Sequence, residues 1–195
     1  MRRSSVRPKA LFLTTVAESL TSSRAHEIVS VARELLESEG PEALTMRRLA
    51  DALGLRAPSL YKHLPHKAAL EVAIITDGFE EAAIAFEEAT NGVDKPLGAL
   101  VQAYRSFVSA HPHLYRLMTE RPLPREQLPP GLEARTAAPL VHATGSPARA
   151  RAAWAFIHGM VMLELNQRFP PDGLTETAWQ SGITAFAHGH RHSES

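Results

Sequence analysis

The stretch LTMRRLADALGLRAPSLYKHLPHKAAL, residues 44–70, decides the fold of this chain. Thr45 is a good N-cap for a short helix, because its hydroxyl can accept a hydrogen bond from a backbone N–H of the first turn. Leu49 and Leu53 lie four residues apart and therefore share one face of that helix. Gly54 follows and favours the end of the helix. The first segment is therefore predicted to be a short amphipathic helix.

The second segment of the stretch begins at Pro58, a residue that suits the first turn of a helix. Leu60 and Leu64 can point inward together. Polar side chains are left on the outer side, namely Ser59, Tyr61, Lys62 and His63. Two short helices joined by a glycine turn form a helix-turn-helix unit, and the second helix usually enters the major groove of DNA. The polar outer side is therefore predicted to face DNA.

The charge is distributed unevenly, although the net charge is zero. Residues 1–70 contain 11 Lys and Arg against 7 Asp and Glu, a balance of 11 − 7 = +4. The remainder contains 10 against 14, a balance of 10 − 14 = −4. Such asymmetry favours a part that contacts a polyanion and a part with another role.

The composition narrows the class of protein. The chain has 195 residues, of which 44% are apolar, enough to fill a core. It has no cysteine, which excludes disulfides, thiolate zinc sites and cysteine nucleophiles. The first apolar run ends at Glu18, and no segment has the roughly 18 apolar residues that a membrane span needs. We expect a soluble, cytoplasmic protein without a cofactor or a bound metal.

The rest of the chain shows helical periodicity and no alternating strand pattern, so the predicted fold class is all-α. We expect a basic arm over 1–23, a helix-turn-helix domain over 24–70, and a helical ligand-binding and dimerisation domain over 71–195. The first helix is predicted to start at the Ser22-Ser23 signal and to stop at Gly40-Pro41. Further helices are predicted over 67–89 with Ile84 inward, 97–110, from Pro112, and over 132–143, 147–168 and 174–188.

The quoted stretch closely resembles the helix-turn-helix signature of TetR-family transcriptional regulators: a capping Thr, two basic residues, LAxxLG, a small residue and proline before LY, then H and K-x-x-L. The segment WAFIHGMVMLE resembles a subgroup with a W-x-x-x-H-G signature, here Trp154, His158 and Gly159. The resemblance implies a homodimer that binds a palindromic operator in double-stranded DNA, acts as a repressor, and releases the operator when a small effector binds.

The resemblance also implies roles for individual residues. Phosphate contacts fall on Thr45, Tyr61 and Lys67. Positions facing the groove are Arg47, Ala57, Pro58, Ser59, Lys62 and His63, and Arg48 is placed with them as a further outward basic residue. Ala57 departs from relatives with a polar base reader at this position. The basic arm, with Arg2, Arg3, Arg7 and Lys9, either reaches the minor groove or is a disordered tail.

The helix over 147–168 is apolar on two sides. A second copy of the same helix is the simplest partner for the second side, although burial inside a monomer is the alternative. The dimer interface is predicted at Val161, Leu165, Ala178, Gly182, Ile183 and Phe186.

A mostly apolar effector is predicted to contact aromatic and sulfur-containing side chains of the C-terminal domain. The main candidates are Tyr115, Met118, Trp154, His158 and Met162, and the further polar candidates are His111, His113, Glu164 and Asn166. The alternative is that they are ordinary core residues. The tail HGHRHSES and the pair His111 and His113 offer imidazoles for a metal, but no carboxylate partner is evident, and a solvated terminus is the preferred interpretation.

Two other functions compete with the regulator. An enzyme is disfavoured because the sequence has no Gly-rich phosphate loop, nucleophile elbow or HExxH pair. A ligand-blind architectural DNA-binding protein would use its C-terminal helices only to dimerise, and would bind DNA in a salt-dependent manner without an effector response.

Overall fold

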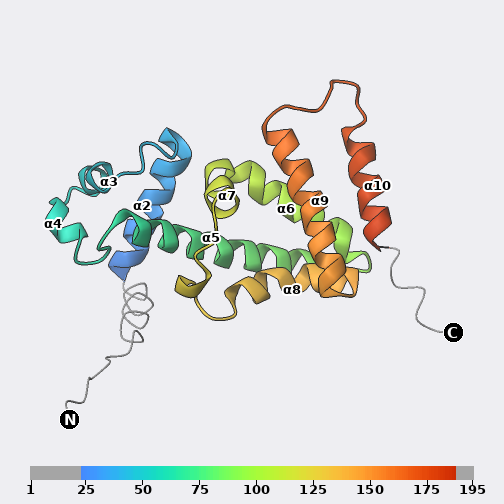
Figure 1. Cartoon of the computed structure of the whole chain (residues 1–195), viewed down its shortest axis with the longest axis horizontal. Coiled ribbons are helices and arrows are strands. Elements are labelled where there is room, and N and C mark those ends of the chain that lie inside the picture. Colours follow the sequence, from blue (N-terminus) through green and yellow to red (C-terminus); the bar gives the residue numbers. More distant parts are fainter. Residues whose placement is uncertain (1–22, 188–195) are drawn as a thin grey trace, which may run out of the picture. The chain divides into compact units, whose positions relative to one another are not determined.

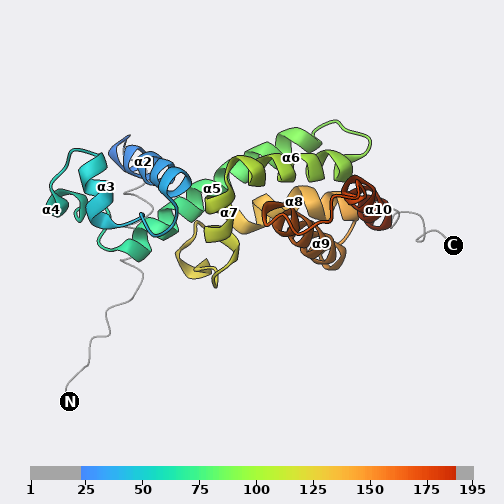
Figure 2. The ribbon, with the colours of Figure 1, turned by 90° about the horizontal axis from the view of Figure 1, so that it is seen from above.

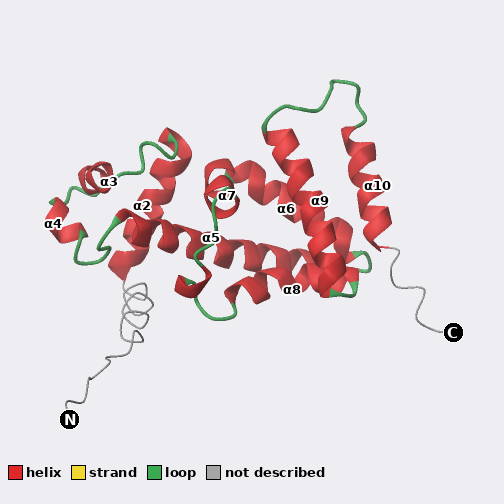
Figure 3. Ribbon diagram, in the orientation of Figure 1, coloured by secondary structure: helices red, strands yellow, loops and turns green. Residues whose placement is uncertain are grey.

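The computed structural model describes residues 23–187, and this part of the chain is helical without any strand (Figures 1 and 3). The elements are α2 (Ser23–Glu39), α3 (Met46–Ala52), α4 (Ala57–Leu60), α5 (Lys67–Thr90), α6 (Pro96–Ala110), α7 (Pro112–Thr119), the 3-10 helix η1 (Arg125–Gln127), α8 (Leu132–Thr144), α9 (Pro147–Leu165) and α10 (Thr175–Ala187). The predicted all-α class is confirmed.

The chain divides into two compact units. The first contains the described residues up to Asp77 together with Arg116–Pro129, and the second contains Gly78–Tyr115 and the described residues from Pro130 onward. The sequence-based boundary at residue 70 assigned 116–129 to the C-terminal domain, whereas the structure groups this segment with the helix-turn-helix. The two units share the continuous helix α5.

In the first unit, α2, α3 and α4 enclose a leucine core. Leu36, Leu49 and Leu60 are each 0% exposed. Helix α4 is shorter than the predicted helix: it ends at Leu60, and residues 61–63 form a turn. His63 N and Leu64 N both donate to Leu60 O, so the chain forms a turn after Leu60, and Pro65, which has no N–H, cannot extend the helix beyond it.

In the second unit, α6 contacts α8, α9 and α10, and α9 packs beside α10 (Figures 1 and 2). Trp179 of α10 is 0% exposed in this core. The expectation that Ile84 points inward is wrong, since its side chain is 47% exposed. The 100° step of a helix places Ile84 on the side of Glu80 and Glu88, opposite the buried Ala82.

Helix α9 ends at Leu165, three residues before the predicted end. Asn166 is its C-cap, and Arg168 N donates to Leu163 O at 2.8 Å. In the described part of the chain, no helix combines the length and apolar character that crossing a membrane requires.

Candidate nucleic-acid interface and ligand-binding region

The geometry of the helix-turn-helix follows from local hydrogen bonds. Thr45 Oγ1 accepts from Arg48 N at 3.1 Å, so the predicted N-cap of α3 is confirmed. Gly54 has φ +63°, a left-handed conformation that side chains with a Cβ rarely adopt, and it ends the turn after α3. Beyond it, Ser59 N donates to Arg56 O at 2.9 Å at the start of α4. These bonds fix α3 and α4 on either side of the turn.

Most of the predicted DNA-contacting residues lie on the outer side of this unit. The exposed ones are Thr45, Arg47, Pro58, Ser59, Tyr61, Lys62 and Lys67, while His63 is half-buried and Ala57 is the first residue of α4. Tyr61 is 47% exposed, although an aromatic side chain of this size is usually covered. Among the described residues Arg47 forms no ion pair, so its guanidinium can bind a partner outside the chain.

Arg48 differs from its neighbour Arg47. Its Nε donates to Glu39 Oε2 at 3.1 Å, and its Nη2 donates to the other oxygen of the same carboxylate. The hydrogen bond to Arg48 lowers the pKa of Glu39, which keeps the pair charged. Arg48 therefore ties α3 to α2, and the prediction that it contacts DNA is not supported by its position.

Lys67, the first residue of α5, lies 3.8 Å from Glu71 Oε1. Arg121 approaches the same oxygen at 3.6 Å. Both ion pairs are long and involve exposed basic side chains, so each contributes little to stability. Lys67 therefore remains available to a phosphate.

In the second unit, four polar aromatic side chains form one hydrogen-bonded row. Trp154 Nε1 donates to Tyr104 Oη at 3.1 Å, Tyr104 Oη is 2.9 Å from Tyr115 Oη, and Tyr115 Oη is 2.6 Å from His158 Nδ1. Trp154 and His158 are one turn apart on α9, which explains why the W-x-x-x-H spacing brings both to the same row. Tyr104, on α6, was not predicted from the sequence, and nothing in its local pattern distinguishes it from an ordinary core tyrosine.

The donor and the acceptor of each hydrogen bond in the row follow from the number of protons available. An indole N–H can only donate, so Tyr104 accepts from Trp154 and has one proton to give. Every buried proton finds an acceptor if Tyr104 donates to Tyr115 and Tyr115 donates to His158 Nδ1. Burial raises the pKa of Tyr104 and of Tyr115, so both hydroxyls stay protonated at neutral pH.

The predicted ligand-binding residues are only partly brought together. Tyr115, Trp154 and His158 satisfy one another's polar groups, and Met162 is half-buried on the same helix as Trp154. None of these four lines any of the four described cavities. Met118 belongs to the first unit, where it lines a cavity of about 150 Å³ between α5 and the segment that follows α7.

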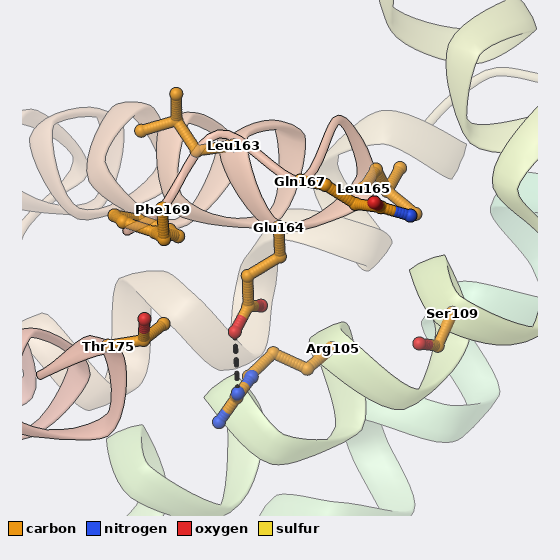
Figure 4. A pocket seen from close by; sticks show the side chains of 8 residues that line it. All are labelled: Arg105, Ser109, Leu163, Glu164, Leu165, Gln167, Phe169 and Thr175. Carbon is orange, nitrogen blue, oxygen red and sulfur yellow. Dashed lines mark hydrogen bonds and ion pairs between the residues drawn. The ribbon is translucent and has the colours of Figure 1, made fainter. Parts of the chain in front are cut away.

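A different cavity lies between α6 and the C-terminal end of α9 (Figure 4). Its volume is about 420 Å³, and its walls are Arg105, Ser109, Leu163, Glu164, Leu165, Gln167, Phe169 and Thr175. Arg105 Nη2 donates to Glu164 at 2.7 Å and its Nη1 donates to Glu176 at 2.9 Å. Burial alone would lower the pKa of Arg105, but its hydrogen bonds to these two carboxylates outweigh burial and raise it.

The structure places the predicted dimer residues in three different environments. Val161 is 2% exposed and packs in the chain's own core, so its inclusion in an interface between chains is not supported. Gly182 faces Phe156 of the same chain: a Cβ there would lie 2.0 Å from the ring. Its small size therefore serves a contact within the chain. The half-buried residues are Leu165, Ala178, Ile183 and Phe186.

Within residues 23–187 no group of three or more His, Asp or Glu side chains is placed to hold a metal ion. The tail histidines His188, His190 and His192 and the basic arm over 1–22 lie outside the described residues.

A buried-leucine scaffold that exposes Arg47, Tyr61 and Lys62 around a glycine turn defines a helix-turn-helix DNA-binding protein. Residues 28–74 match the model of bacterial regulatory proteins of the tetR family, and residues 97–186 match the tetracyclin repressor-like C-terminal domain. An uncharacterised HTH-type transcriptional regulator of Mycobacterium tuberculosis is 31% identical over 173 residues, 82% of this chain and 78% of the relative. The chain belongs to the TetR family of transcriptional regulators, which are DNA-binding proteins and not enzymes.

Other similarities are partial or concern the fold alone. The nucleoid occlusion factor SlmA of Vibrio vulnificus is 29% identical over 110 residues, 53% of this chain and 55% of that protein. The structure of the regulatory protein SCO4313 covers 92% of this chain, with 98% of its own length matched, at TM-score 0.65 and 21% identity. A single-residue variant of TetR from Acinetobacter baumannii, in complex with minocycline, covers 85% of this chain, with 92% of its own length matched, at TM-score 0.55 and 23% identity.

Proposed function

We propose that this regulator is a ligand-responsive homodimeric repressor that binds a palindromic operator. The observation that carries the DNA-binding part is the exposed outer side of α3, α4 and the following turn. Arg47 suits a bidentate contact with guanine, and Tyr61 and Lys67 suit phosphates. Thr45 uses its oxygen as an acceptor for the cap, so its hydroxyl proton can still be donated to a phosphate.

The outer faces of α9 and α10 support a dimer. On α9 the side opposite the core carries small or apolar residues at helical spacing, namely Ala148, Ala152, Ala155, Gly159, Met162 and Leu163. The outer side of α10 carries Thr177, Ser181 and Ala185, which are exposed and uncharged. The α9 face carries one charged residue, the exposed Arg151, at its edge beside Met162. An exposed face of small and apolar residues is typical of an interface, and a two-fold axis through it would relate two helix-turn-helix units to two operator half-sites.

The second unit is proposed to bind the effector, a small and mostly apolar molecule. The similar fold crystallised with minocycline supports this role. Helix α5 belongs to both units and begins at Lys67, so a shift of this helix would alter the DNA-contacting residues. An effector can release DNA only if it binds the released conformation more tightly than the operator-bound one.

Selection of bound fragments from the organism's own DNA by the purified chain tests the proposal, with the salt concentration varied. Recovery of one palindrome is expected. Nonspecific binding is lost as salt rises, because it depends on counterion release. Binding that is indifferent to sequence would contradict the repressor.

Arg47 and Arg48 are adjacent in the sequence, so their alanine variants form a matched pair. Arg47→Ala is expected to relax preference at one base pair by about 1–3 kcal/mol. Arg48→Ala should leave that preference unchanged, because its guanidinium is held by Glu39. Competition binding to operators with single base changes measures both, and equal effects of the two variants would contradict the assigned roles.

A ligand-blind architectural DNA-binding protein is the second candidate. The partial similarity to a nucleoid occlusion factor favours keeping it in the test. Such a protein would bind DNA and dimerise, yet no small molecule would change its operator affinity.

A further inference from the structure

The cavity between α6 and the end of α9 has the size of a small-molecule site. Its volume of about 420 Å³ lies within the range of roughly 300–1,000 Å³ that such sites occupy. Leu165 and Phe169 provide apolar surface, and Arg105, Ser109 and Glu164 provide polar groups (Figure 4). The lining therefore suits a molecule with an apolar body and a polar end.

The charges beside the cavity are unbalanced. The guanidinium of Arg105 is bonded to two carboxylates, those of Glu164 and Glu176. Hydrogen bonds from Gln180 and Arg105 lower the pKa of Glu176, so this carboxyl is ionised at neutral pH. One positive and two negative groups leave a net charge of one negative unit, which attracts a cation and repels an anion.

Glu164 offers a specific acceptor. Its Oε1 already accepts from Arg105 Nη2 at 2.7 Å and from Trp179 Nε1 at 3.0 Å. Its Oε2 accepts no hydrogen bond from any residue between 23 and 187. A carboxylate has room for about four hydrogen bonds. Figure 4 shows that Glu164 points from α9 toward α6, into the space between them.

Gln167 is the residue that follows the C-cap of α9. Gln167 has φ +52°, the one positive φ of a non-glycine residue in the described part of the chain. This position directly after the C-cap of α9 is usually a glycine, because a Cβ is unfavourable there. The Gln167 side chain lines the cavity and forms no hydrogen bond within the described residues.

We propose that this cavity binds a small organic ammonium ion, whose N–H groups donate to Glu164 Oε2 and to the Gln167 side-chain oxygen while its apolar body lies against Leu165 and Phe169. The ion would balance the net negative charge of the Arg105 cluster. The proposal rests on the proposed function in one respect, since it names the chemistry and the place of an effector in the second unit.

Calorimetric titration of the full chain without DNA tests the site. Phenethylammonium is the probe, and phenylacetate and 2-phenylethanol present the same ring with an anionic or a neutral end. We expect phenethylammonium to bind at least about tenfold more tightly than either analogue. Glu164→Gln should weaken its binding about fivefold or more, whereas Glu88→Gln on the exposed side of α5 should not.

The variant Gln167→Gly separates a loss of binding from a loss of stability. Glycine relieves the left-handed backbone, so this variant should melt at a higher temperature and still bind the probe several-fold more weakly. Equal binding of phenylacetate, unchanged affinity in both cavity variants, or no saturable binding of phenethylammonium up to about 5 mM would each overturn the proposal. If the probe binds but no operator is found, the site stands and the repressor proposal fails. If an operator is found but the probe does not bind, the repressor proposal stands and the ammonium site fails.

Discussion

Replacing Tyr115 by Phe removes one oxygen atom from the middle of the hydrogen-bonded row on α6, α7 and α9. Tyr115 is 2% exposed, and its hydroxyl lies 2.9 Å from that of Tyr104 and 2.6 Å from His158 Nδ1. The phenyl ring can keep the edge-on packing against Tyr104, where the ring centroids are 5.8 Å apart. The variant therefore tests the hydrogen bonds with little change in packing.

The expected loss of stability follows from the two groups left behind. The Tyr104 hydroxyl belongs to a residue that is 8% exposed and would lose its acceptor, which costs about 1–3 kcal/mol for a buried donor. His158 is half-buried, so water can replace part of its lost bond, and its contribution is smaller. We expect a decrease of about 2–3 kcal/mol in the free energy of unfolding.

Urea unfolding measures this decrease at one fixed protein concentration, because the proposed dimer would make the stability depend on concentration. Tyr61→Phe is the matched control: Tyr61 is 47% exposed, and its variant should stay within about 0.5 kcal/mol of the parent. A loss below about 0.5 kcal/mol for Tyr115→Phe would refute the reasoning, since the row would then not stabilise the unit.

Three further outcomes are expected. Thr45→Ala should lower the free energy of unfolding by about 1 kcal/mol through loss of the cap, and Thr45→Ser should restore most of it in the same unfolding experiment. Gly182→Ala should cost about 1–3 kcal/mol, because its Cβ would meet the Phe156 ring at 2.0 Å, and Phe156→Leu in the same chain should recover part of the loss. Burial raises the pKa of Tyr104 and Tyr115 in the folded chain. The stability that depends on their protonated hydroxyls is therefore present below about pH 10, the pKa of tyrosine in the unfolded chain, and falls as the pH rises past that value. Unfolding experiments at increasing alkaline pH would detect this fall.

Local patterns in the sequence determined the helices and the helix-turn-helix. The cap at Thr45, the turn at Gly54 and the inward Leu60 depend on residues within a few positions of one another, and α3 and its turn follow those patterns. The end of α4 at Leu60 was missed, because Pro65 directly restricts only Leu64 and no local signal marks the turn over 61–63. The outward orientation of Arg47 was likewise predictable from the spacing of the leucines beside it.

The roles of side chains that meet across helices were decided by the tertiary structure. Arg48 and Arg47 are indistinguishable in the sequence, but Glu39 of α2 lies within reach of only one of them. The α9 residue Val161 packs inward, because the neighbouring helices select which of two apolar sides becomes core.

The hydrogen-bonded row and the charged cavity of the second unit were also decided by tertiary structure. The partner of Trp154 is Tyr104, fifty positions away, and Arg105 reaches carboxylates on two other helices. A helical period tells which residues share a face, and it carries no information about what lies opposite that face. The sequence by itself therefore determined the helix-turn-helix and the kind of protein, while the packing of distant helices decided the hydrogen-bonded row and the charged cavity.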